Sequence, residues 1–256
     1  MEHRAAWTSA PWGAFCFDSP AMMGGQRMGL LDGAYARVER VDAHIAEFDE
    51  RAEAWGNTGG GKAMAEKHLH QLDTLPPHRR EKLVADIPPI FGIIAGEAIY
   101  NLRAALDYLA HELTFLDSGC YLLRSQFPIE DTRDNWNQMS RKTVEVMSSA
   151  HREAIEALQP YSECEWTARL RNLSNPDKHR RLTILKPFST RQFVLSPPKS
   201  KAETPVRLAD IDVQRIVSFY IGFDGDCWVP EAVHNLKVEI SATLDAFNPD
   251  FKAKGF

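Results

Sequence analysis

The basic residues of this chain are concentrated between Arg169 and Arg191. This segment contains seven lysines and arginines and one acidic residue, Asp177, so its formal charge is +6, whereas the whole chain carries −5. Guanidinium and ammonium groups gathered in this way suit phosphate better than a neutral substrate. The alternative is that Asp177 caps a turn while the cations face water. The pattern therefore indicates either a phosphate-binding segment or a solvated basic surface.

A second set of polar residues lies within the segment from Ile90 to Phe115. Its apolar residues repeat at helical spacing, which predicts a long central helix with one apolar and one polar face. The polar face consists of Glu97, Tyr100, Asn101, Arg103, Asp107, Tyr108 and His111. Lysines and glutamates would indicate a merely solvated face. Tyrosines, an amide, an arginine, an aspartate and a histidine together can form a site.

Arg103 and Asp107 are four residues apart, so they can pair on one face of this helix. An exposed pair of this kind contributes only about 0.3 to 0.5 kcal/mol. If the basic segment instead covers the face, Arg103, Asp107, Asp177 and Arg180 can form a buried network that locks the bundle. We regard this structural role as the stronger hypothesis for the pair, ahead of catalysis.

The helices and strands that the sequence predicts around these residues indicate an α+β protein, which is mainly a helical bundle. Besides the central helix, hydrophobic periodicity predicts helices over residues 30–55, 143–158, 164–173 and 230–247, with a turn over 174–177. Short β-type runs predict a small antiparallel sheet from the C-terminal third, at residues 182–186, 191–195 and 215–223. We expect a single domain over residues 29–256, preceded by a poorly ordered leader over residues 1–28.

Composition limits the partners. A net charge of −5 makes the chain as a whole a poor electrostatic binder of nucleic acid, so such binding must come from the local basic segment. No run approaches the roughly 18 apolar residues of a membrane span, and we expect no membrane partner. The four cysteines are scattered without a CxxC pair, which favours a reducing cytoplasm. The acidic helix over residues 30–55 has a seam pattern that can serve a homodimer.

Signals for a metal or a cofactor are weak. Glu231 and His234 form one ExxH, but di-iron bundles need a second copy and two further glutamates. The triple glycine Gly59–Gly61 precedes Lys62 without the spacing or the Ser or Thr of a phosphate-binding loop. We interpret the glycines as a linker after the first helix, followed by a short helix or strand around residues 65–72. We expect neither a metal nor a cofactor.

Four short motifs occur in order along the chain. They are LRxALDxL at residues 102–109, FPI at 127–129, LQPY at 158–161 and DKHR at 177–180. This set resembles a group of uncharacterised bacterial proteins, and the resemblance spans roughly residues 31–247. It carries no catalytic assignment.

More distantly, the helix, the turn and the basic His-containing segment are similar to the HEPN superfamily, whose helical bundles include metal-independent endoribonucleases. The motif of that family is an arginine, commonly followed by a polar residue, and then a histidine, with four to six residues between the arginine and the histidine. Here Arg171-Asn172 is followed by His179, with seven residues between Arg171 and His179. The resemblance implies a protein that binds or cleaves RNA, in a toxin or phage-defence setting.

Through this resemblance His179 becomes the candidate general base, which accepts the proton of a ribose 2′-hydroxyl. Arg171 or Arg180 would stabilise the charge that develops on phosphorus, without a metal. Asp107 or Asn101 would orient the imidazole. The remaining candidate binding residues are Arg103, Asp177, Lys178 and Tyr100. The alternatives are a turn histidine at position 179, hydrogen-bonded to backbone, and a non-catalytic structural or interaction domain.

Overall fold

The computed structural model describes residues 14–15, 29–74, 87–122, 125–178, 185–196, 212–223 and 227–255. The chain forms two compact units. The first comprises Met1–Phe48, Gly92–Thr183 and Pro230–Phe256, and the second comprises Asp49–Phe91 and Ile184–Val229. The sequence predicts one domain over residues 29–256. Hydrophobic periodicity does not predict this division, because the boundaries at Phe48 and Phe91 each lie inside a continuous helix.

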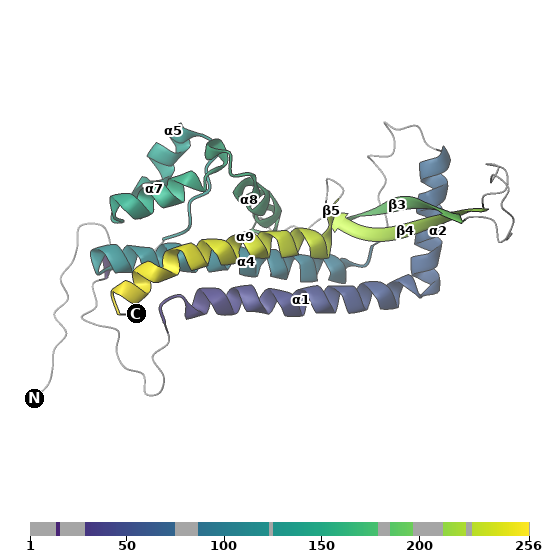
Figure 1. Ribbon diagram of the computed structural model, residues 1–256, viewed down its shortest axis with the longest axis horizontal. Coiled ribbons are helices and arrows are strands. Elements are labelled where there is room, and N and C mark those ends of the chain that lie inside the picture. The colour runs from purple at the N-terminus through teal and green to yellow at the C-terminus, as the bar shows by residue number, and fades with distance from the viewer. Residues whose placement is uncertain are drawn as a thin grey trace, which may run out of the picture. The chain divides into compact units, whose positions relative to one another are not determined.

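Long helices dominate the first unit. They are α1 (Asp32–Gly56), α4 (Pro89–Ser118) and α9 (Val229–Ala253). Within this unit the three helices run alongside one another (Figure 1). The Tyr35 hydroxyl donates to Asp245 at 2.7 Å, and Lys237 donates to Asp42 at 2.6 Å, so polar pairs join α1 to α9. The prediction of a mainly helical protein with these three helices is confirmed.

The core of the first unit follows the predicted apolar face of α4. Leu102, Leu106, Leu109 and Leu113 are fully buried. Burying a leucine side chain stabilises a fold by roughly 1.5 to 3 kcal/mol, so this row is a large contribution from a single helix. Apolar side chains of α9, such as Leu244, are equally buried.

Shorter elements complete this unit. They are α5 (Arg133–Asn135), a π-helix (Trp136–Ser140), α6 (Arg141–Val144), α7 (Ser149–Ala157), a 3₁₀ turn (Pro160–Ser162) and α8 (Glu165–Lys178). Figure 1 shows α5, α7 and α8 together on one side of α4 and α9. Two short strands, β1 (Ala14–Phe15) and β2 (Tyr121–Leu122), pair antiparallel.

The expected continuous helix over residues 143–158 is wrong. It is divided into α6 and α7, and Ser148 starts the second helix. The Ser148 side chain accepts a hydrogen bond from the backbone N–H of His151, and its own N–H donates to Asp117 at 2.7 Å. A serine that satisfies these backbone groups favours a new helix start over continuation.

The expected turn over residues 174–177 is also wrong, because α8 continues to Lys178. Proline lacks a backbone N–H and disfavours helical geometry in the residue before it, which is why the sequence favours a turn at Pro176. Pro176 lies in the last turn of α8, which ends at Lys178. A proline so close to the end disturbs little helical structure beyond it. The Ser174 hydroxyl donates to the Arg171 carbonyl at 3.2 Å, within the preceding turn.

The second unit contains α2 (Gly59–Thr74) and the strands β3 (Leu185–Ser196), β4 (Asp212–Phe223) and β5 (Cys227–Trp228). The strands pair antiparallel in the order β3-β4-β5. Leu185 lies opposite Phe223 at one end of the β3–β4 ladder, and Ser196 lies opposite Asp212 at the other.

The triple glycine is part of a helix, so its interpretation as a linker is wrong. Gly59–Gly61 form the first turn of α2, and the Thr58 hydroxyl accepts a hydrogen bond from the Gly61 N–H at 3.1 Å. A Cβ atom on Gly61 would lie 2.2 Å from the backbone carbonyl oxygen of Trp55. Glycine is therefore needed at position 61 because two backbone segments approach each other closely there. The conformational freedom of glycine does not explain its presence.

Two further observations concern the cysteines and the apolar character of the helices. Cys120 is disulfide-bonded, so the expectation of reduced thiols fails at this position. Among the described residues, we find no helix with the length and apolar character that crossing a membrane requires. Apart from Ala14 and Phe15, the predicted leader over residues 1–28 lies outside the described residues.

Candidate ligand-binding face of helices α4 and α8

Arg103 and Asp107 clamp the backbone of Phe127. The Phe127 N–H donates to Asp107 Oδ1 at 2.9 Å, and Arg103 Nη2 donates to the Phe127 carbonyl. Arg103 Nη2 also lies 3.1 Å from Asp107 Oδ1. Burial lowers the pKa of Arg103, and the neighbouring carboxylate opposes that effect. The pair thus supplies the hydrogen bonds that a neighbouring strand would give to an extended segment.

Gln159 holds the same extended segment from the other side. Its side-chain amide donates to the carbonyls of Pro128 and Ile155 at 3.0 and 2.9 Å, and its carbonyl accepts from the Glu130 N–H at 2.9 Å. Gln159 is fully buried. The LQPY motif contains Gln159, but the sequence alone indicates no role for it. The LRxALDxL motif, through Arg103 and Asp107, and the LQPY motif, through Gln159, therefore both bind the backbone at the FPI motif.

Asn101 is engaged with α1. Its carbonyl accepts from Arg37 at 3.1 Å, and its amide nitrogen donates to the Glu97 carbonyl at 2.9 Å and lies 3.3 Å from His44 Nε2. An amide nitrogen only donates, so Nε2 of His44 accepts and its ring proton is on Nδ1, 3.6 Å from Glu97. Burial lowers the pKa of His44, which favours this neutral form.

The candidate residues of the basic segment are described in part. Arg171 pairs with Asp131 at 2.7 Å, which joins α8 to the loop before α5. Asp177 and Lys178 form the end of α8, but their side chains lie outside the described part of the chain. His179 and Arg180 lie outside the described residues altogether. The proposed roles of His179 and Arg180 toward a phosphate, and a network between Arg103, Asp107, Asp177 and Arg180, therefore stay predictions.

A pocket of about 400 Å³ lies along the polar face of α4. Its lining residues are Gly96, Tyr100, Arg103, Ala104, Asp107, Tyr108, Gln126 and Ser174. Most of them belong to α4, while Ser174 belongs to α8 and Gln126 precedes the extended segment. The helix that leads into the basic segment therefore borders a pocket with the polar face of the central helix. Of the candidate residues, Tyr100, Arg103 and Asp107 lie in this pocket.

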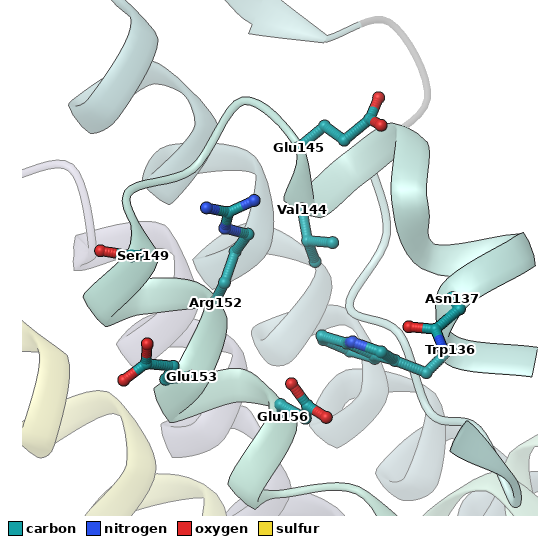
Figure 2. A pocket seen from close by; sticks show the side chains of 8 residues that line it. All are labelled: Trp136, Asn137, Val144, Glu145, Ser149, Arg152, Glu153 and Glu156. Carbon is teal, nitrogen blue, oxygen red and sulfur yellow. The ribbon is translucent and has the colours of Figure 1, made fainter. Parts of the chain in front are cut away.

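A second pocket, of about 510 Å³, lies among α5, the π-helix, α6 and α7. Figure 2 shows Trp136 entering it from one side and Arg152 from α7, with Glu153 and Glu156 nearby. The Glu156 carboxylate already pairs with Arg133 at 3.2 Å and accepts from the Tyr161 hydroxyl. None of the candidate residues from the sequence lies here.

Other ionisable clusters in the first unit join helices. His151 on α7 lies 2.6 Å from Asp117 on α4 and 3.3 Å from Asp250 on α9, so one imidazole bridges two carboxylates. His111 contacts the Ser125 hydroxyl at 2.7 Å. Within the part of the chain that is described, no group of three or more His, Cys, Asp or Glu residues could hold a metal ion.

Comparison with known proteins adds no relative: no family model, no curated protein and no solved structure matches this chain. The site is therefore interpreted from its own residues.

Proposed function

We propose that this chain is a HEPN-like module that binds single-stranded RNA on the face that α4 and α8 share. The observation that supports the proposal most is the pocket along α4, which Ser174 of α8 also lines. Four residues after Ser174, α8 ends and the chain enters the most basic part of its sequence. A ligand that combines flat rings with phosphates suits a chain with two tyrosines in this pocket and a basic segment further along its sequence.

In the catalytic form of this proposal, the chain is a metal-independent endoribonuclease. His179 accepts the 2′-hydroxyl proton, and the 2′-oxygen attacks the adjacent phosphorus. The bond from phosphorus to the 5′-oxygen of the next nucleotide breaks, and this oxygen takes a proton from water. The products are a cyclic phosphate and a 5′-hydroxyl. Arg171 and Arg180 stabilise the charge on the phosphorane. Asp107 or Asn101 orients the imidazole of His179 in this scheme, and Asp107 Oδ1 also contacts Phe127 and Arg103.

RNA cleavage in EDTA tests the catalytic form. The parent protein should cut a labelled single-stranded RNA without added metal, and His179→Ala should reduce the rate about 10²- to 10⁴-fold, the usual contribution of a general base. His70→Ala is a matched control, because His70 is exposed on α2. Binding without cleavage by the parent, or undiminished cleavage by His179→Ala, would reject the nuclease and leave an RNA-binding module.

A second candidate function is a non-catalytic structural or interaction domain. It is favoured by the Arg103, Asp107 and Gln159 contacts, which use the most distinctive motif residues to hold the backbone of residues 127–130. If the chain has this second function, the parent protein should not bind RNA. We further propose a homodimer through α1, a cytoplasmic location, and a bacterial toxin or phage-defence setting. The Cys120 disulfide weighs against the cytoplasmic location.

A further inference from the structure

Two tyrosines on α4 are unusually exposed. Tyr100 is 55% exposed and Tyr108 is 41% exposed, and both line the pocket along α4. They are eight residues apart, which is about 12 Å along a helix. The lining residues between and beside them include Gly96 and Ala104, whose small side chains leave room above the helix. Large rings left open to solvent along a pocket suit a flat ligand.

The ring of Tyr108 is held in place by α1. The guanidinium of Arg37 lies 5.8 Å from the centre of the ring, a cation–π arrangement. A Cβ atom on Gly33 would lie 2.9 Å from the ring, so glycine is what allows the tyrosine to approach α1 closely. Because Arg37 is itself bound by Asn101, the ring is positioned by a chain of contacts before any ligand arrives.

The polar atoms of Arg103 and Asp107 are already used within the protein. Arg103 Nη2 donates to the Phe127 carbonyl, and Asp107 Oδ1 accepts from the Phe127 N–H. The Nε of Arg103 has no hydrogen-bond partner among the described residues, but it is buried and a ligand in the pocket cannot contact it. Recognition in this pocket therefore depends on the two tyrosine rings, which suit the flat faces of nucleic-acid bases.

We propose that the pocket along α4 takes unpaired bases of single-stranded RNA, with Tyr100 and Tyr108 as stacking platforms. This inference rests on the RNA-binding function proposed above and specifies its substrate class. Duplex RNA is excluded, because its bases stack on one another and leave no ring face for a tyrosine.

Fluorescence anisotropy with the full chain tests this. The probes are a labelled single-stranded RNA of about 12 nucleotides, the same RNA annealed to its complement, and a version that lacks bases at central positions. Base–aromatic stacking is worth about 5- to 100-fold in affinity per base. Tyr100→Ala and Tyr108→Ala should each weaken binding of the single strand by that factor, and Tyr100→Phe and Tyr108→Phe should restore most of it.

Ile93→Ala is the matched control, because Ile93 is 41% exposed on the same helix but does not line the pocket. It should leave affinity unchanged, and circular dichroism should show the same helix content for all variants. If the parent binds the single strand but the alanine variants bind equally well, or if duplex and base-free RNA bind as tightly, the stacking inference is wrong and RNA binding stands. If the parent binds none of the RNAs, the proposed function falls.

Discussion

The carboxylate of Asp107 accepts from the backbone N–H of Phe127 and pairs with Arg103, whose side chain is almost completely buried. In sequence, the pair lies on a polar helix face and can be interpreted as part of a catalytic set. In the structure, its nearest partners are backbone atoms of an extended segment. At this scale the same residues that suggest chemistry stabilise the fold.

Asp107→Asn should therefore lower stability. The amide cannot neutralise Arg103, and its oxygen can satisfy only part of the two contacts, so we expect a loss of about 2 to 3 kcal/mol in the free energy of unfolding. Urea denaturation measures it. Glu153→Gln, an equivalent change at an exposed position on α7, should stay within about 0.5 kcal/mol of the parent. Equal stability of Asp107→Asn and the parent would contradict the clamp.

Glu112 gives a pH-dependent prediction. Burial raises its pKa to about 7, and the hydrogen bond from the Tyr121 hydroxyl partly opposes this shift. The folded protein therefore holds this proton more tightly than the unfolded chain does, whose glutamate titrates near 4.5. The contribution to stability is present below about pH 4.5 and is lost as the pH rises through 7.

Glu112→Gln keeps a neutral side chain at every pH. It should match the parent near pH 4.5 and be the more stable protein at pH 8, by ~1 kcal/mol, a value reduced because the group is partly exposed. Urea denaturation at a series of pH values measures the difference. A difference that stays constant with pH would show that burial does not perturb Glu112.

Among the elements, the start of α2 gives the sharpest contrast. Gly60 and Gly61 are adjacent in the first turn, but a Cβ atom on Gly60 would meet only the Thr58 hydroxyl, at 3.8 Å, whereas one on Gly61 would meet the Trp55 carbonyl oxygen. Helix propensity alone favours alanine at both positions by about 0.5 to 1 kcal/mol.

We expect Gly60→Ala to raise the free energy of unfolding by that amount, and Gly61→Ala to lower it by about 1 to 3 kcal/mol, because backbone atoms must shift. Thermal or urea denaturation of the two variants, compared with the parent, measures both changes. Equal effects of the two substitutions would mean that the close approach of Trp55 does not constrain α2.

Some elements follow from the sequence and others do not. The long helices are predicted from the spacing of residues such as Leu102, Leu106 and Leu109, because one period over many residues specifies one buried face. The break at Ser148 is not, because it depends on Asp117, which is thirty-one residues away in the chain. Likewise, the sequence alone indicates a linker at Gly61, because it does not show that the Trp55 carbonyl lies close to this position.

For the whole molecule, the sequence predicts a polar face on the central helix and a basic segment, but not how either is used. Tyr100, Arg103 and Asp107 are predicted together and line one pocket. Gln159 is missed because a buried amide that holds backbone has no distinctive spacing. Tyr108 gains its importance only from Gly33 and Arg37 on another helix.

The measurement that tests the central claim most directly is photocrosslinking of a single-stranded RNA carrying 5-iodouridine, followed by mass spectrometry of the peptides. We expect crosslinks at Tyr100 and Tyr108, which lie in one pocket of the first unit. Crosslinks confined to the second unit, at Tyr220 or Trp228 for example, or no crosslinks at all, would contradict it.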